Sequence, residues 1–397
     1  MGTPAAIAEN IYWVGVVDWN IRLFHGPTLS TPYGTTYNSY LIMDEKNALV
    51  DTVYAPFTDD LVDKLKQLID PARIDYLVIN HIEPDHSGAF PVIRRLCPNA
   101  KVFCSQRALE GLKSYYGGEY DYTVVKSGDT LKLGKNTLAF IEAPMLHWPD
   151  SMFTYIPEQE LLLPNDAFGQ HLATTYRFDD EGELEFILGE AAKYYANILM
   201  PFSAQVLKKL EEVQKLGIKI KTIAPSHGLI WRRNPEAILS AYARWAESKG
   251  RPKAVIAYDT MWNSTEKMAY ALMDGLMAGG AEVKLFKASV SDRSDVMKEV
   301  LDARAVLVGS PTMNNDILPV VSPLLDELVG LRPRNKIGMA FGSYGWAGGA
   351  QKIIEERLKA AKIELIEPGP SLKWAPADAD LDRCRELGKE IARRIAD

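Results

Sequence analysis

The stretch Asn80-His81-Ile82-Glu83-Pro84-Asp85-His86-Ser87-Gly88 gathers two imidazoles and two carboxylates. The preceding run, Tyr76-Leu77-Val78-Ile79, is apolar as a buried strand should be, and Ser87-Gly88 opens a helical pattern. The cluster therefore lies on a strand-to-helix loop, where short side chains can converge on one point. Two interpretations follow. The loop either supplies metal ligands, or it is a solvated loop in which Asp85 or Ser87 caps the next helix.

Three further polar residues stand just past apolar strands: His147 after 143–146, Asp166 after 161–165, and His227 after 223–226. With the first cluster they make four imidazoles and three carboxylates. That set is too large for one four- to six-coordinate ion, so it predicts two metals. Each residue taken singly would more often be an ordinary hydrogen-bonded group of the core or of a loop, but the shared position at strand ends favours metal ligands.

The length of 397 residues predicts two domains. Residues 1–56 have the pattern of short strands, and strands then alternate with helices, as expected for two mixed sheets packed together with helices outside. The polar run 247–252 interrupts this pattern. We therefore expect an α/β protein with a first domain over 1–250 and a second over 251–397.

The second domain repeats a strand-then-helix unit, beginning with a strand at 254–258 and a helix at 264–277. Nearly continuous apolar strands joined by helices predict a doubly wound parallel sheet covered on both faces. In such sheets ligands bind beyond the carboxyl ends of the strands, near the point where the strand order reverses.

Three loops follow the first, third and fourth strands of this sheet: 259–265, 310–316 and 342–349. The first is rich in hydroxyls and amides, contains no lysine, and opens a helix, so it suits a phosphate held by hydroxyls and backbone N–H groups. Helix capping, and aromatic side chains that belong to the core, are the simpler alternatives. The candidate cofactor-binding residues are Thr260, Met261, Trp262, Asn263, Ser264, Pro311, Thr312, Met313, Asn314, Asn315, Ser343, Tyr344, Gly345, Trp346, Ala347 and Gly348.

The composition argues against three classes of protein: those that bind nucleic acid, those that span a membrane and those that hold an iron–sulfur centre. The net charge is -7 and no basic tract is interleaved with aromatic residues, which argues against nucleic acid as a partner. No apolar run is long enough to cross a bilayer, and the N-terminus lacks a signal pattern, so we expect a cytoplasmic protein without a membrane partner. The three cysteines cannot supply four thiolates for an iron–sulfur centre. Electron transfer would therefore need another cofactor and an external donor.

The pattern His81-x-Glu83-x-Asp85-His86, followed by His147, Asp166 and His227, resembles that of the flavodiiron proteins. The resemblance spans the chain and implies a metallo-β-lactamase-like αβ/βα sandwich followed by a flavodoxin-like domain that binds FMN. It implies two iron ions with an oxo or hydroxo bridge. His81, Glu83 and His147 would bind the first iron, Asp85, His86 and His227 the second, and Asp166 would bridge them. In some members the histidine at the position of His86 turns away from the metal.

The resemblance also implies a function and partners. His25 and Tyr195 resemble residues that line the substrate pocket and donate protons or hydrogen bonds, whereas His171 is read as structural. The family reduces nitric oxide to nitrous oxide, oxygen to water, or both, with electrons passing through FMN from rubredoxin or a similar small protein. With no rubredoxin-like segment after residue 397, the donor is expected to be a separate protein. The subunits are expected to pair head to tail as a homodimer, with a dimer of dimers as a larger assembly.

Two alternatives remain at this point. One is a zinc hydrolase of the metallo-β-lactamase fold with an accessory flavodoxin-like domain, in which a metal-bound hydroxide attacks an ester or amide. Glu83 counts against it, because zinc hydrolases of this fold usually carry a histidine there and a carboxylate suits iron better. The other is an electron carrier or diatomic sensor with a degenerate metal domain, against which the complete ligand set argues.

Overall fold

The computed structural model describes residues 2–26, 28–118, 120–366 and 368–396. By its internal contacts the chain divides into two compact units. The first comprises Met1–Phe24, Thr31–Tyr194 and Ala204–Ala243, and the second comprises His25–Ser30, Tyr195–Ser203 and Arg244–Asp397. The predicted α/β class, with a sandwich followed by a doubly wound sheet, is confirmed. The domain boundary after residue 250 stays a prediction.

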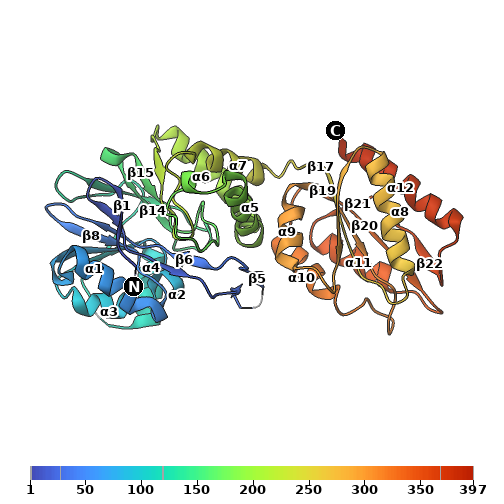
Figure 1. Cartoon of the computed structure of the whole chain (residues 1–397), viewed down its shortest axis with the longest axis horizontal. Coiled ribbons are helices and arrows are strands. Elements are labelled where there is room, and N and C mark those ends of the chain that lie inside the picture. The colour runs from blue at the N-terminus through green and yellow to red at the C-terminus, as the bar shows by residue number, and fades with distance from the viewer. Residues whose placement is uncertain (1, 27, 119, 367, 397) are drawn as a thin grey trace. The chain divides into compact units, whose positions relative to one another are not determined.

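The first unit contains two mixed sheets (Figure 1). Short β-branched and aromatic runs bounded by polar turns form their strands. The larger sheet has the order β1 (Ala5–Ala8), β2 (Ile11–Trp13), β7 (Tyr40–Ile42), β8 (Asn47–Val50), β9 (Ile74–Ile79), β10 (Lys101–Cys104) and β11 (Tyr122–Val124). The smaller has the order β12 (Thr130–Lys132), β13 (Thr137–Glu142), β14 (Met152–Ile156), β15 (Leu161–Leu163) and β16 (Thr222–Ile223). Short strands of this unit outside these sheets are β3 (Val16–Asp18), β4 (Leu23–Phe24) and β6 (Thr35–Tyr37), whereas β5 (Leu29–Ser30) belongs by its contacts to the second unit.

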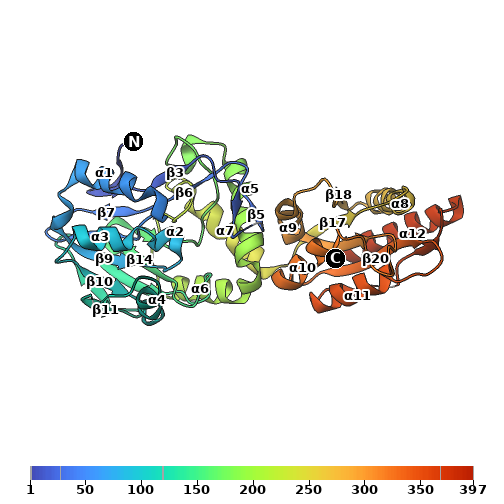
Figure 2. The same ribbon diagram turned by 90° about the horizontal axis from the view of Figure 1, so that it is seen from below.

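The core of this unit lies between the two sheets, where alternate side chains of both interdigitate. Ile42 and Val50 of the larger sheet share one buried cluster with Phe140 and Leu161 of the smaller. Helices cover the outer faces (Figure 2). Those that follow strands of the larger sheet are α1 (Thr58–Leu68), α2 (Pro84–Ser87), α3 (Phe90–Leu96) and α4 (Gln106–Tyr116); the later ones are α5 (Leu184–Tyr194), α6 (Ser203–Lys215) and α7 (Pro235–Glu247).

The second unit is built on one parallel sheet with the order β18 (Glu282–Lys287), β17 (Arg251–Tyr258), β19 (Ala303–Gly309), β20 (Ile337–Tyr344) and β21 (Glu364–Leu365), with β22 (Ser371–Lys373) also paired to β20. The order reverses between β17 and β19, so the loops after these strands diverge and leave a crevice. Helices α8 (Ser264–Ala278) and α12 (Asp378–Ala396) pack on one face, and α10 (Ser322–Leu331) and α11 (Ala350–Ala360) on the other (Figures 1 and 2). The remaining helix is α9 (Arg293–Asp302).

One element differs from its prediction in a way that concerns the site. The helical pattern of the sequence predicts a helix over residues 191–199. The structure instead forms α5 from Leu184 to Tyr194 and continues as a π-helix over Tyr195–Leu199. A π-helix rotates the side chains that follow it, and such insertions are frequent at functional sites.

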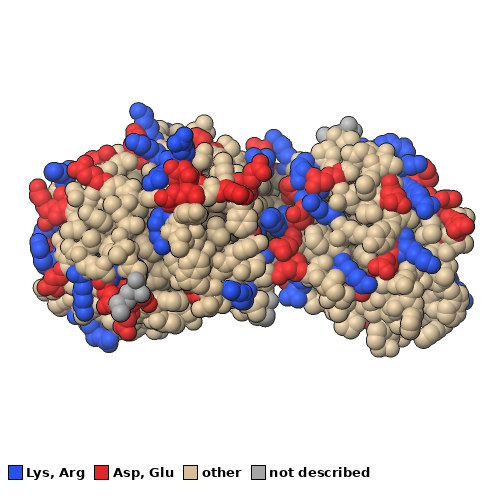
Figure 3. Space-filling view, viewed as in Figure 1, with Lys and Arg blue, Asp and Glu red and all other residues tan. Residues whose placement is uncertain are grey.

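Two further observations bear on partners. Among the described residues, no helix is both long and apolar enough to span a bilayer. On the face shown in Figure 3, the described lysine and arginine side chains are intermixed with aspartate and glutamate. Charges of both signs in such a mixture do not form the basic stripe typical of a nucleic-acid interface.

Candidate metal centre and flavin cleft

The predicted metal ligands of the first unit converge from the ends of separate strands. His81 and Glu83 follow β9, and α2 carries Asp85 and His86. The others come later in the chain: His147 after β13, Asp166 after β15 and His227 after β16. They form two groups, each with ligand atoms within 4.8 Å of one another: His81, Glu83, His147 and Asp166, and beside them Asp85, His86 and His227.

The carboxylate of Asp166 lies between the two groups. Its Oδ2 is 3.5 Å from Nε2 of His81 and 3.3 Å from Nε2 of His147. Its Oδ1 is 2.9 Å from Nε2 of His86 and 3.5 Å from Nε2 of His227. One oxygen therefore faces each group, which is the arrangement that a carboxylate bridging two cations requires.

The remaining carboxylates complete one group each. Glu83 Oε2 lies 3.3 Å from His81 Nε2 and 3.1 Å from His147 Nε2. Asp85 Oδ2 lies 3.2 Å from Nε2 of both His86 and His227. The Nε2 atom of His86 thus points into the second group. Each group holds two imidazoles and one carboxylate of its own and shares Asp166.

Two of the imidazoles are oriented through their other nitrogen. Nδ1 of His81 is 2.9 Å from Oδ2 of Asp150, and Nδ1 of His227 is 2.6 Å from the carbonyl oxygen of Thr36. Such contacts fix the tautomer and leave Nε2 for a metal. Asp150 was not singled out from the sequence, although its position three residues after His147 in His-Trp-Pro-Asp offered a signal.

The contacts within the cluster do not satisfy its polar atoms. Although some of these atoms lie within ion-pair distance of one another, both carboxylate oxygens of Asp85 and of Asp166 and both ring nitrogens of His86 are buried without a hydrogen bond of acceptable geometry. Buried polar atoms are almost always hydrogen-bonded, so such an accumulation indicates that a cation belongs among them. The residues present fit a two-metal centre.

The pKa shifts of the cluster residues show that the carboxylates stabilise positive charge among them. Burial lowers the pKa of His86, but the carboxylates of Asp166 and Asp85 outweigh it and raise the pKa to about 9. Burial raises the pKa of Asp166, yet His86 and the other imidazoles hold it well below its usual range. A site that stabilises protonated imidazoles beside ionised carboxylates stabilises metal cations for the same reason.

Aromatic side chains enclose the second group. The ring of His227 lies 4.9 Å from that of His171, 5.5 Å from Phe24 and 5.9 Å from Tyr194. His171 in turn lies 4.9 Å from Tyr194, and its Nδ1 is 2.9 Å from the hydroxyl of Thr35. The sequence did not single out Tyr194 and gave His171 only a structural role, because ring contacts between distant segments leave no local pattern.

The two other predicted site residues, His25 and Tyr195, belong by their contacts to the second unit. The hydroxyl of Tyr195 is 3.0 Å from that of Ser203, and its ring lies 5.4 Å from Trp245. Burial raises the pKa of Tyr195 to about 12. His25 adopts a left-handed backbone conformation with φ 50°. Their role in a substrate pocket stays a prediction.

The second unit has a cleft at the carboxyl ends of β17, β19 and β20, with a volume of about 990 Å³ when the space open to solvent is included. All three predicted loops contribute to it. Of the predicted residues, those lining the cleft are Met261, Trp262, Ser264, Pro311, Thr312, Ser343, Tyr344, Gly345 and Trp346. Those outside the lining are Thr260, Asn263, Met313, Asn314, Asn315, Ala347 and Gly348.

A fourth segment, Trp374-Ala375, also lines the cleft and was missed. It follows β22, a strand that the sequence pattern does not predict, and the N–H of Trp374 donates to the carbonyl of Tyr344. Trp262 and Trp346 are 87% and 88% exposed. These indoles are free to stack on a flat ring at the mouth of the cleft.

The loop 259–265, which borders the cleft and leads into α8, suits a phosphate. Asn263 stands at the N-cap of α8 in a left-handed conformation with φ 65°, which asparagine tolerates better than most residues. The helix that begins here directs its free N–H groups into the loop. The hydroxyl of Thr260 is buried without a hydrogen-bond partner in the structure. An anion at this position would satisfy these donors, so the residues fit a flavin phosphate.

Comparisons with known proteins agree with both sites. Residues 35–228 match the model of the ODP family beta lactamases, and residues 256–388 match that of the flavodoxins. The chain is 69% identical over 399 residues to a nitric oxide reductase of Moorella thermoacetica, covering 100% of both chains. It is 42% identical to the anaerobic nitric oxide reductase flavorubredoxin of Escherichia coli O1:K1 / APEC, covering 98% of this chain and 82% of that protein.

Solved structures give the same result. The rubredoxin oxygen:oxidoreductase of Desulfovibrio gigas superimposes with a TM-score of 0.96 at 41% identity, covering 99% of this chain and 98% of that one. The flavodiiron protein of Giardia intestinalis superimposes with a TM-score of 0.96 at 35% identity, covering 100% and 97%. Since these comparisons cover 98–100% of this chain, the relatives span both the sandwich and the flavodoxin-like unit. The chain is therefore an oxidoreductase that belongs to the flavodiiron protein family.

Proposed function

We propose that this protein reduces nitric oxide to nitrous oxide, oxygen to water, or both, at a non-haem di-iron site refilled through FMN by a rubredoxin-type donor. The observation that carries the proposal is the placement of Asp166, one oxygen toward each three-residue group. The names of the Moorella thermoacetica and Desulfovibrio gigas relatives support the two gases. Bound in these sites, iron would bind the gas and pass electrons to it, and FMN would supply them.

The residues assigned to the metals follow from the two groups. His81, Glu83 and His147 would hold one iron, and Asp85, His86 and His227 the other, with Asp166 shared. Three carboxylates give the site hard oxygen ligands, which suit iron that reaches the ferric state. With a hydroxide bridge they would also balance the charge of two ferrous ions. A zinc hydrolase is the less favoured function, because Glu83 occupies a ligand position between two imidazoles.

The surroundings of the cluster would exclude water and supply protons. His81, His86 and His227 are at most 1% exposed, and Phe24 packs against the His227 ring. Both reductions consume protons as well as electrons. Tyr194 is buried beside the cluster, with its ring 5.9 Å from that of His227, and burial raises the pKa of its phenol. Tyr194 is therefore our candidate for holding a proton at the site, beside the predicted donors His25 and Tyr195.

Three further features belong to the proposal. The exposed tryptophans of the flavin cleft are free to contact another subunit, as a head-to-tail homodimer would require. The names of the Desulfovibrio gigas and Escherichia coli relatives refer to rubredoxin, which supports a rubredoxin-type donor. The free cysteines Cys97, Cys104 and Cys384 are all buried, as suits a reducing cytoplasm.

The test is anaerobic reduction of the purified protein with rubredoxin, followed by limited nitric oxide or oxygen while the consumption of each gas is recorded. Iron content and flavin absorbance are measured on the same sample. Consumption of one gas with about one FMN and two irons per chain supports the proposal. A colourless protein that contains only zinc and hydrolyses esters or amides would refute it. The dependence of turnover on protein concentration tests the homodimer.

A further inference from the structure

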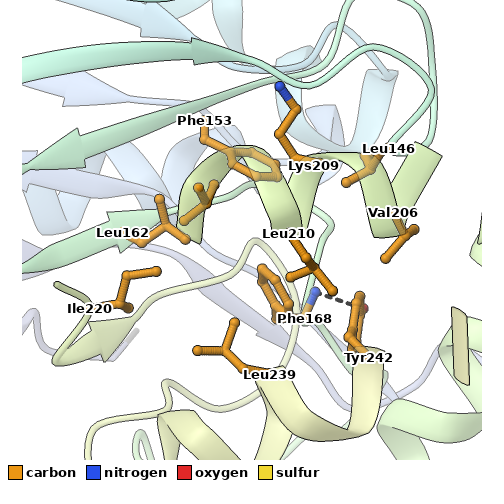
Figure 4. A pocket seen from close by; sticks show the side chains of 11 residues that line it. Leu146, Phe153, Leu162, Phe168, Val206, Lys209, Leu210, Ile220, Leu239 and Tyr242 are labelled. Atoms are coloured by element: carbon orange, nitrogen blue, oxygen red, sulfur yellow. Dashed lines mark hydrogen bonds between the residues drawn. The ribbon is translucent and has the colours of Figure 1, made fainter. Parts of the chain in front are cut away.

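The sandwich unit contains an apolar cavity that no part of the proposed metal or flavin site uses. It lies between strands β14 and β15 of the smaller sheet and helices α6 and α7 (Figure 4). About 330 Å³ of space is left unfilled by atoms, counting gaps between side chains and space open to solvent. The part that a water-sized sphere can occupy is small, on the scale of one small molecule.

The wall of this cavity offers nothing to a polar ligand. Lys209 contributes its methylene stem, while its ammonium donates to the carbonyl of Glu142 and, at 2.7 Å, to the carboxylate of Glu212. The hydroxyl of Tyr242 accepts the N–H of Phe168 at 2.6 Å (Figure 4). The other lining groups are aliphatic or phenyl side chains. A cavity without free hydrogen-bonding groups does not hold water well and favours apolar molecules.

The inner wall of the cavity is formed by the same loops that carry the metal ligands. Leu146 lines the cavity, and the next residue is His147. Phe168 lines it from the loop that begins with Asp166. The loop also packs on the second group, since a Cβ added at Gly169 would lie 3.4 Å from Cβ of His227.

The cavity has a buried end and an end near the surface. Leu146 and Phe168 are each 3% exposed, and Tyr242 is fully buried. On the opposite side Val213, Ile220 and Leu239 are only half-buried. Partly exposed side chains of this kind change rotamer within nanoseconds, and this is the motion that would admit a molecule of two atoms at the rim.

We propose that this cavity binds small apolar gas molecules and conducts them from the rim at Ile220 and Leu239 to the inner wall at Leu146 and Phe168, beside the metal cluster. The class of ligand is a neutral molecule of low polarity, such as oxygen or nitric oxide. The delivery role rests on the proposed function, whereas the binding of gas does not. The transfer of either gas from water to an apolar site is favourable, because it lowers the free energy of the gas. The local concentration of the gas beside the metals therefore rises.

Binding is tested with xenon, which is apolar, inert and visible in diffraction. Crystals of the intact protein pressurised with xenon are expected to show a xenon atom among Phe153, Leu162, Phe168 and Val206. The variant Val206→Phe fills this space from α6 and is expected to lose the atom, whereas Leu207→Phe adds the same group beside the cavity and retains it. Absence of xenon from the wild-type cavity would overturn the proposal.

Delivery is tested by gas kinetics on the same two variants. Val206→Phe is expected to lower kcat/KM for the gas severalfold while leaving kcat at saturating gas, iron content and flavin content unchanged, and Leu207→Phe to leave all of these unchanged. Leu239→Phe, at the half-buried rim, provides a second obstruction if Val206→Phe fails to fold. Unchanged kcat/KM in a variant that has lost xenon would refute delivery. A wild-type protein that binds xenon but reduces neither gas would refute the proposed function, and with it the delivery role, while the gas site would stand.

Discussion

A single carboxylate oxygen, Oδ2 of Asp150, lies 2.9 Å from Nδ1 of His81 and also accepts the N–H of Ile82 at 2.9 Å. One atom thus fixes both a ligand ring and the backbone of the loop that carries Glu83. Asp150 is 2% exposed, so no water replaces it easily.

We predict that Asp150→Asn weakens iron binding about 10- to 100-fold, the usual effect of removing the partner of a metal-bound histidine. Flavin content should be unchanged. Iron retention during dialysis against a chelator series measures the effect, and Asp121→Asn, at an exposed carboxylate of the same unit, is the control. Iron affinity equal to that of the wild type would mean that Asp150 does not orient His81.

Glu83→Ala should remove iron and gas consumption but leave the flavin in place. The substitution deletes a carboxylate that contacts both His81 and His147, while the cleft of the second unit is untouched. Metal analysis, flavin absorbance and gas consumption are measured together. Full activity in Glu83→Ala would show that the metal assignment is wrong.

The combined change Asn263→Ala and Ser264→Ala should do the reverse, with FMN lost and iron kept. It removes the polar side chains at the start of α8 and imposes a left-handed conformation on alanine, which costs about 1 kcal/mol. Asn335→Ala is a matched control, because Asn335 has φ 55° and does not line the cleft. FMN affinity is measured by fluorescence titration of the apoprotein. If Asn335→Ala lost as much FMN affinity as the double variant, the loss would be due to backbone strain alone.

Tyr194→Phe should slow turnover while iron and FMN contents remain normal. The change removes one phenol beside His227 and His171 and preserves the ring contacts. If the phenol supplies protons, the solvent isotope effect on turnover should rise in the variant. Tyr195→Phe is the informative comparison, since the hydroxyl of Tyr195 is bonded to Ser203. If only Tyr195→Phe slowed turnover, Tyr195, the residue predicted from the sequence, and not Tyr194 would be the proton donor.

Lys336 gives a prediction for pH and stability in the second unit. Burial lowers its pKa from 10.5 to about 8, so the unfolded chain binds more protons than the folded one between these values. Below pH 8 the buried ammonium of Lys336 is charged and lowers the free energy of unfolding. As the pH rises from about 8 to 10.5, the folded protein loses this charge and the free energy of unfolding rises. Lys336→Met should stabilise the second unit at pH 7 by on the order of 1–3 kcal/mol. The advantage should shrink above pH 8.

The measurement is urea unfolding followed by the release of FMN, at pH 7 and pH 9.5. Lys359→Met, at an exposed lysine of α11, controls for the loss of a positive charge. An advantage for Lys336→Met that does not change with pH would show that better packing, rather than the buried charge, is responsible.

The sequence predicted much of this architecture for physical reasons that can be named. Apolar strands followed by isolated polar residues predicted the seven candidate metal ligands, which the structure brings together, because strand ends meet at one edge of a sheet. The regular strand–helix repeat predicted in the same way the three loops that line the cleft of the second unit. Asp150 and Trp374 were missed, since each acts through a contact with a segment distant in sequence. The start of α5 at Leu184 and the π-helix over Tyr195–Leu199 were not predicted, because hydrophobic periodicity locates helix ends only approximately and does not distinguish a π-helical turn from an α-helical one.

The seven candidate ligands are separated by up to 146 positions, from His81 to His227, and both sheets of the sandwich contribute strand ends to them. Metals bound there would tie the two halves of the unit together much as a cross-link does. Their loss would leave only the contacts between imidazoles and carboxylates to hold that edge of the sandwich together. Iron supply would then govern how much of the protein survives in its folded form, in addition to how fast it works.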